Sequence, residues 1–96
     1  MLSSKQRAYL KGLAMNMDPI YQVGKSSITP ELINGISEAI LKRELIKISV
    51  LKNCSDDPKE IAEILSSRTK SETVQVIGKK IILYRAAKKP KIELPR

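Results

Sequence analysis

The fold is decided by residues 20–51, IYQVGKSSITPELINGISEAILKRELIKISVL, which predict a strand, a helix and a second strand. Thr29 is a typical helix N-cap, Pro30 suits the first helical position, and Glu31 places an acid in the first turn. Residues 45–51 alternate apolar and polar side chains, which indicates a strand with one buried face. Because a helix of about a dozen residues joins the strands, we expect a right-handed crossover and a parallel strand pair.

The flanking segments add two helices and a hairpin. Apolar side chains recur at helical spacing over residues 4–17, after a capping Ser3 or Ser4. Asp57 is expected to cap a third helix, and strands at 73–77 and 81–84 flank a turn containing Gly78. The element order α-β-α-β-α-β-β predicts a two-layer α/β domain, with three helices on a small mixed four-stranded sheet. We assign residues 1–86 to this domain and 87–96 to a basic, flexible tail.

Composition excludes several classes of site. The chain has 96 residues, no His and one Cys. It therefore cannot assemble a Cys/His zinc site or pair a Ser or Cys nucleophile with His. We expect no metal, no cofactor and no small-molecule substrate, and we interpret Cys54 as a small buried side chain. The apolar runs are short and no apolar leader follows Met1, so we expect a cytoplasmic protein without a membrane segment or signal peptide.

The charge is large and unevenly distributed. The formal net charge is +8. Residues 1–52 carry eight basic and four acidic side chains, residues 53–78 carry three and five, and residues 79–96 carry seven and one. This pattern predicts a basic surface patch that attracts a polyanion through its phosphates.

The loop Gly24-Lys25-Ser26-Ser27 joins the first strand to the second helix. Free amides at the helix N-terminus, the helix dipole and Lys25 all favour an anion there, and Gly24 permits close approach of the backbone. The loop resembles the end of a nucleotide-binding P-loop, but that motif needs a glycine where Pro19 stands. Nucleotide hydrolysis is therefore disfavoured.

The aromatic residues Tyr9, Tyr21 and Tyr84 are scattered along the chain. A sheet that stacks bases presents aromatic side chains on neighbouring strands, so a stacking platform is not expected. Tyr84 fits the core or the sheet edge better than a single stacking position. Binding directed to the nucleic-acid backbone by lysine, arginine and exposed amides is the remaining interpretation.

Six short motifs in register resemble a known family. They are Lys5-Gln6-Arg7, Pro19, Val23-Gly24-Lys25, Leu45-Ile46-Lys47, Gln75-Val76-Ile77-Gly78 and Leu83-Tyr84-Arg85. Their order and spacing over about residues 3–86 resemble the CRM domain, the chloroplast RNA-splicing and ribosome-maturation domain, in its single-domain bacterial YhbY-type form. The resemblance implies a fold like the C-terminal domain of translation initiation factor three, RNA binding, and association with precursors of the large ribosomal subunit.

The sequence departs from the family pattern at two positions. The family's GxxG loop maps onto Gly24-Lys25-Ser26-Ser27, so Ser27 replaces the second glycine, and Asn16 stands where histidine is common. A serine with positive φ costs on the order of 1 kcal/mol. Either the loop relaxes to negative φ, or the Ser27 hydroxyl replaces an amide contact to RNA.

We therefore expect a monomeric, non-catalytic RNA-binding protein that assists ribosome assembly on precursor rRNA. A regulator acting on DNA or a small RNA is the alternative, and an enzyme using carboxylates or lysine has less support. The tail residues Lys88, Lys89 and Lys91 would add non-specific attraction. The expected RNA-binding residues are Gly24, Lys25, Ser26, Ser27, Lys5, Arg7, Lys11, Lys47, Lys79, Lys80 and Arg85.

Overall fold

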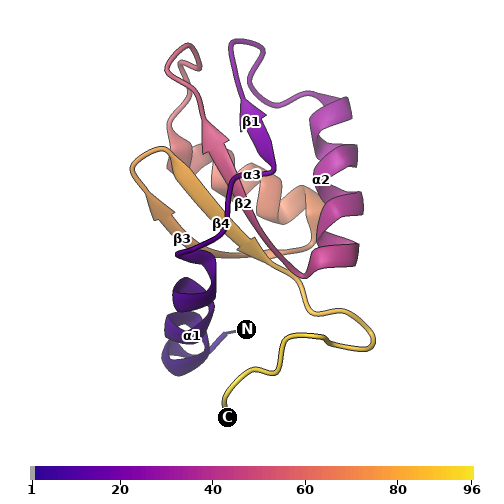
Figure 1. The fold of residues 1–96 in the computed structure, drawn as a ribbon. Coiled ribbons are helices and arrows are strands. Elements are labelled where there is room, and N and C mark those ends of the chain that lie inside the picture. The colour runs from indigo at the N-terminus through magenta and orange to yellow at the C-terminus, as the bar shows by residue number, and fades with distance from the viewer. Residues whose placement is uncertain (1) are drawn as a thin grey trace.

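A computed structural model describes residues 2–96 and contains the expected elements in the expected order (Figure 1). No helix in this range is long and apolar enough to cross a membrane. The elements are α1 (Ser4–Ala14), β1 (Tyr21–Val23), α2 (Pro30–Arg43), β2 (Leu45–Val50), α3 (Pro58–Thr69), β3 (Glu72–Ile77) and β4 (Lys80–Tyr84).

All three helices begin at the predicted capping residues. Ser3 forms a capping box with Gln6 at the start of α1. The Thr29 hydroxyl accepts the Leu32 amide at 3.1 Å, and Asp57 caps α3 in the same way through a nearby amide. These bonds satisfy amides that a helix start otherwise leaves free, so the boundaries predicted for the helix starts are confirmed. The helix α1 ends at Ala14, earlier than the apolar spacing predicts.

The sheet has the strand order β1-β2-β4-β3. Strands β1 and β2 are parallel, with Tyr21 opposite Ile48, which confirms the predicted crossover. Strands β3 and β4 form the predicted antiparallel hairpin around Gly78, whose φ is +54°. Strand β4 also pairs antiparallel with β2 and is therefore central. Its apolar residues 81–84 are buried on both faces of the sheet.

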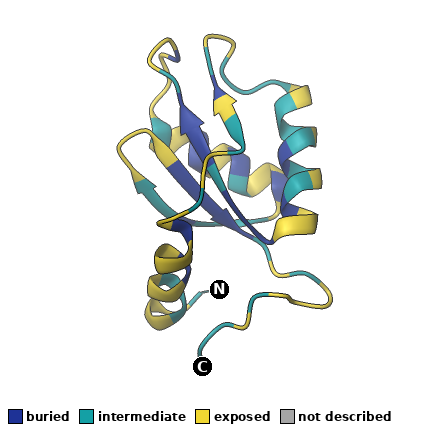
Figure 2. Cartoon of the chain, in the orientation of Figure 1, coloured by how far each residue is buried: buried dark blue, intermediate teal, exposed yellow. Residues whose placement is uncertain are grey.

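The helices flank both faces of the sheet, so the domain has a second, smaller core. The α/β class and the element order are confirmed, but the expected two-layer arrangement is not what forms. Helices α2 and α3 cover one face over the larger core, whereas α1 packs on the other face through Leu10 and Ala14. Figure 2 shows the buried centre of the sheet. Strand β4 is apolar on both faces over residues 81–84. In β2, Leu45 faces the smaller core and Ile46 faces the larger one, so both faces of the sheet need a helix to bury their apolar side chains.

Part of the C-terminal segment is docked onto the domain. Residues 85–96 form no helix or strand, but Ile92 and Leu94 pack against the smaller core. The Lys91 amide donates a 2.5 Å hydrogen bond to the carboxylate of Glu44. Glu44 is itself buried and ends α2 with φ of +66°. These contacts restrain the tail at several points, and its flexibility stays a prediction.

Candidate nucleic-acid interface

Helix α1 covers only one end of its face of the sheet. Its buried residues contact the end of the sheet marked by Leu45 and Tyr84. Toward the other end, Lys47 pairs with Ile82, and Lys80 pairs with both Ser49 and Ile77. Since paired residues point to the same face, these side chains lie together on a part of the sheet that no helix covers.

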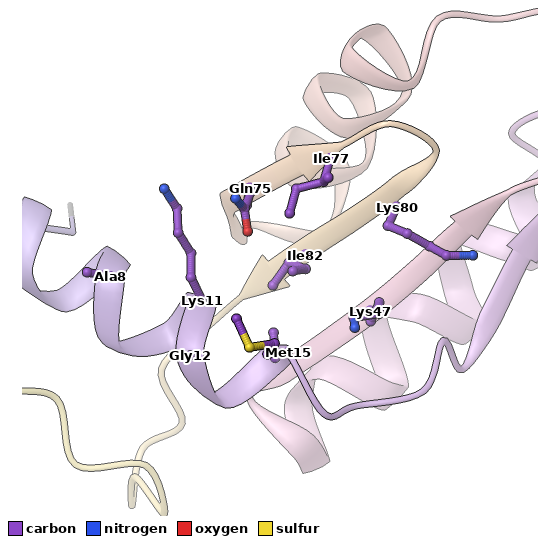
Figure 3. A pocket seen from close by; sticks show the side chains of 10 residues that line it. Ala8, Lys11, Gly12, Met15, Lys47, Gln75, Ile77, Lys80 and Ile82 are labelled. Carbon is purple, nitrogen blue, oxygen red and sulfur yellow. The ribbon is translucent and has the colours of Figure 1, made fainter.

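A hollow of about 480 Å³ lies between α1 and this uncovered part of the sheet. In Figure 3, Met15 and Ile82 lie between Lys11 on one side and Lys80 on the other. None of the residues that line the hollow is acidic. They are Ala8, Lys11, Gly12, Ala14, Met15, Lys47, Gln75, Ile77, Lys80 and Ile82.

The structure brings three of the predicted RNA-binding lysines to this hollow. Lys11 comes from α1, Lys47 from β2 and Lys80 from β4. The Lys80 ammonium donates a 2.8 Å hydrogen bond to the hydroxyl of Ser49, which is buried. Within residues 2–96 no carboxylate forms an ion pair with these three lysines. Their charges are therefore available to an anion, and together they raise the potential over the hollow.

A second basic region lies at the edge of the sheet where β1 and β2 end. The loop Gly24–Ser27 follows β1 and lies beside the loop after β2, as Figure 1 shows at the top of the view. An amide of β2 donates to the Lys79 carbonyl at 2.7 Å, which brings the β3–β4 hairpin to the same edge. Lys25 and Lys79 are both exposed there. The loop and the hollow together give a basic surface that continues from the edge onto the open face.

Ser27 keeps the conformation that a glycine would favour. Its φ is +54°, so the first of the two alternatives, a loop relaxed to negative φ, is not what forms. Its hydroxyl bonds the carboxylate of Asp56 rather than lying free, which argues against the alternative in which it replaces an amide contact to RNA. The hydrogen bond to Asp56 offsets part of the strain of the left-handed conformation.

The N-terminus of α2 offers fewer free amides than expected. Pro30 has no N–H, the Leu32 amide bonds the Thr29 hydroxyl, and the Glu31 carboxylate lies in the first turn. In the preceding loop, the Ser27 amide donates to the Gly24 carbonyl at 2.9 Å. Each of these features weakens the attraction between the N-terminus of α2 and an anion. Lys25 and the remaining loop amides are therefore the parts of the predicted phosphate seat that stay open.

Three predicted RNA-binding residues lie outside both the hollow and the second basic region. Arg7 donates from one guanidinium nitrogen to the Thr73 carbonyl at 2.5 Å and to the Val74 carbonyl at 3.0 Å. These carbonyls lie where β3 has a register shift, so Arg7 serves the fold by bonding backbone groups there. Arg85 follows the far end of β4 and donates to the backbone of α3 at 3.3 Å, and Lys5 is exposed in the first turn of α1.

The remaining candidates have structural roles. Tyr84 is buried, and burial together with the nearby carboxylates of Glu44 and Glu72 raises its pKa above the ordinary value of 10.0. Tyr84 thus belongs to the core, and the described part of the sheet presents no stacking platform. Cys54 is buried in the larger core, as predicted. Residues 2–96 contain no group of three or more side chains that could hold a metal ion.

Sequence reasoning missed the apolar and amide groups of the hollow. Met15 and Ile77 are 79% and 56% exposed, and Gln75 is half-buried. In the sequence Met15 lies within the expected helix over residues 4–17 but off its apolar stripe, and Ile77 ends an apolar strand. Only the register of β3 with β4 places Gln75 and Ile77 beside the lysines.

These features define a small α/β domain with a basic, partly apolar sheet face. The chain belongs to the CRS1 / YhbY (CRM) domain family, which it matches over residues 2–85. It is 46% identical over 96 residues to the "Probable RNA-binding protein YqeI" of Bacillus subtilis, with 99% of this chain and 100% of the relative covered. It is 36% identical to an "RNA-binding protein" of Haemophilus influenzae, with 99% and 96% covered.

A solved structure has the same fold. The solution structure of a hypothetical protein from Staphylococcus aureus superposes with a TM-score of 0.84, and the two chains are 52% identical. The match covers 99% of this chain and 100% of the other. The family and the fold expected from the sequence motifs are therefore confirmed.

Proposed function

We propose that this chain is a monomeric, non-catalytic RNA-binding protein that acts in the cytoplasm on precursor rRNA of the large ribosomal subunit. The observation that carries the proposal is the convergence of Lys11, Lys47 and Lys80 on one uncovered sheet face without an acidic neighbour in the lining. The names of the Bacillus subtilis and Haemophilus influenzae relatives support RNA as the partner. The ribosomal role rests on the family resemblance.

The chemistry of the surface favours binding over catalysis. Lysine ammonium groups act as point charges toward phosphate, and they do not require a defined base sequence. The lining of the hollow holds no carboxylate, and Lys80 donates to the Ser49 hydroxyl as an ammonium and does not accept its proton. Its concave shape suits an irregular or single-stranded RNA segment, whereas a DNA regulator would present a helix with base-reading side chains to the major groove.

Sedimentation of the tagged protein through a sucrose gradient tests the proposal. A gentle lysate is run at low and at high salt, and the fractions are probed for the protein and for precursor rRNA. We expect the protein to migrate with large-subunit precursors at low salt and to leave them as salt rises, because phosphate contacts release counterions. Protein at the top of the gradient at both salt concentrations would contradict the ribosomal role.

A competition experiment separates RNA from DNA as the partner. Purified protein bound to a labelled structured RNA is challenged with equal masses of unlabelled RNA and of duplex DNA. We expect the RNA to compete better because the concave face fits flexible strands. Better competition by duplex DNA would support the DNA-binding alternative instead.

A further inference from the structure

We propose that the hollow beside α1 is a pocket for one unpaired nucleotide, which holds the base against its apolar floor and the adjoining phosphates at its lysines. The proposal rests on the proposed RNA-binding function and adds a binding mode to it. Lysines alone would suit any phosphate backbone. Contacts to the phosphate backbone of RNA do not explain why apolar side chains are exposed between these lysines.

The hollow has an apolar floor that is buried and apolar walls that remain accessible. Ile82 forms the floor at the centre of the sheet, while Ile77 and Met15 project beside it with most of their surface uncovered. A base that leaves water for such a surface gains the free energy of apolar burial. The Met15 thioether also makes favourable contacts with aromatic rings, and a nucleobase is such a ring.

The size and the charge of the hollow fit the same ligand. Its volume of about 480 Å³ lies within the range of small-molecule sites, about 300–1,000 Å³. Lys11 and Lys80 lie on opposite sides of the apolar centre (Figure 3). A nucleotide presents an apolar ring between charged phosphates, so its arrangement complements that of the hollow. A paired base keeps its faces inside the duplex stack and cannot fill the hollow in this way.

Gln75 supplies a polar group for the edge of the base. Its side chain lines the hollow, and within residues 2–96 its amide has no hydrogen-bond partner. A primary amide offers a donor and an acceptor together, which is the arrangement that base edges match. Gln75 is therefore the residue that we expect to discriminate between bases.

The test compares RNA probes that differ only in their bases. The probes are a single-stranded RNA of mixed sequence and about twelve nucleotides, the abasic form of the same backbone, and a duplex of equal length. Affinities are measured by fluorescence anisotropy at one low salt concentration. We expect the abasic strand to bind about three- to tenfold more weakly than the intact strand, as removal of one apolar base contact predicts.

Two variants that keep the net charge of the protein test whether the base lies in the hollow. Ile77→Ser removes exposed apolar surface, and Gly12→Leu fills the hollow from α1, where an added Cβ meets nothing within 4 Å. Leu41→Ser is the matched control, because Leu41 and Ile77 are both 56% exposed and Leu41 lies on α2, on the other face. We expect both hollow variants to weaken the intact strand about three- to tenfold and to leave the abasic strand unchanged.

The outcomes separate the pocket from the general function. Equal affinity for intact and abasic strands, or hollow variants that bind like Leu41→Ser, would overturn the pocket while RNA binding through lysine stands. Failure of every probe to bind at low salt would overturn the proposed function and the pocket with it. Circular dichroism of each variant confirms that it is folded before its affinity is compared.

Discussion

Lys80 and Ser49 face each other across the β2–β4 pair, and the Lys80 ammonium donates a 2.8 Å hydrogen bond to the Ser49 hydroxyl. The bond satisfies a buried hydroxyl on β2, one of the two central strands. It also holds a long, flexible side chain across the open face, so less side-chain freedom is lost when an anion binds. A basic surface is thereby built from the sheet itself and not only from loops.

Removal of the three hollow lysines should weaken RNA binding and its salt dependence together. We expect the intact protein to make about 4–7 phosphate contacts, with a slope of log affinity against log salt of roughly −3 to −6. The triple variant Lys11→Gln, Lys47→Gln, Lys80→Gln should reduce the magnitude of this slope by about 2, at about 0.7 per contact to a single strand. Anisotropy titrations over a salt series measure the slope.

A charge-matched variant controls for the loss of net charge. Lys42→Gln, Arg43→Gln and Lys59→Gln alter exposed residues of α2 and α3, away from the hollow. Their combination should change affinity much less than the hollow variant does. Equal losses in the two triple variants would mean that net charge, and not the arrangement of the sheet face, governs binding.

Arg7 should matter for stability. Arg7→Ala removes two hydrogen bonds from carbonyls of β3, and a hydrogen bond to a charged group contributes about 1.5–3 kcal/mol when it is well shielded. Because Arg7 is half-buried, we expect the free energy of unfolding to fall by about 1–2 kcal/mol in urea denaturation. An unchanged stability with a large loss of RNA affinity would instead assign Arg7 to the interface.

Two substitutions at Ser27 separate its backbone strain from its hydrogen bond. Both Ser27→Ala and Ser27→Gly lose the bond to Asp56, but only glycine also relieves the cost of positive φ, about 1 kcal/mol. We therefore expect Ser27→Ala to be less stable than Ser27→Gly by about 1 kcal/mol. Thermal unfolding of the two variants measures the difference, and the reverse order would contradict the positive φ.

Lys25 should bind RNA without contributing to the fold. Lys25 is exposed, so Lys25→Glu should weaken RNA binding and leave the unfolding midpoint unchanged. Gly24→Ala is the complementary test of close approach, since the nearest atoms to an added Cβ are 3.6 and 3.7 Å away and the fold has room for it. A folded Lys25→Glu protein with full affinity would remove the loop from the interface.

Tyr84 should make stability fall at high pH. Burial, with Glu44 and then Glu72 nearby, raises the pKa of Tyr84 above 10.0, so the unfolded chain loses the phenol proton first. Its contribution is fully present below pH 10 and is lost as the pH rises through the pKa in the folded state. The free energy of unfolding in urea should be measured for the intact protein and for Tyr84→Phe over a pH series. The difference between the two values should stay constant below pH 10 and change above it. A difference that stays constant would contradict the raised pKa.

Local sequence signals predict most of the fold. Thr29-Pro30 and Asp57-Pro58 mark helix starts through chemistry that acts within a few residues, and the structure confirms both boundaries. The parallel pairing of β1 and β2 follows from the helix-containing crossover that joins them. Such features depend on residues that are close together in the chain, so one amino-acid sequence is enough to predict them.

Features set by contacts between distant residues could not be predicted in the same way. The helical spacing in α1 identifies a buried stripe but not the sheet face that receives it. The continuous apolar run at 81–84 is the signal that indicates a central strand buried on both faces. The bonds of Arg7 to β3 and of Ser27 to Asp56 each join segments far apart in the chain, and charge alone assigned Arg7 to RNA.

Amide chemical shifts of the ¹⁵N-labelled protein, followed during titration with a single-stranded RNA, show directly whether RNA binds on the open sheet face. We expect the largest shifts along Lys11–Met15, around Lys47 and over Gln75–Ile82, with smaller shifts at the loop Gly24–Ser27. Shifts confined to the outer surfaces of α2 and α3, with the sheet face unchanged, would contradict binding on that face.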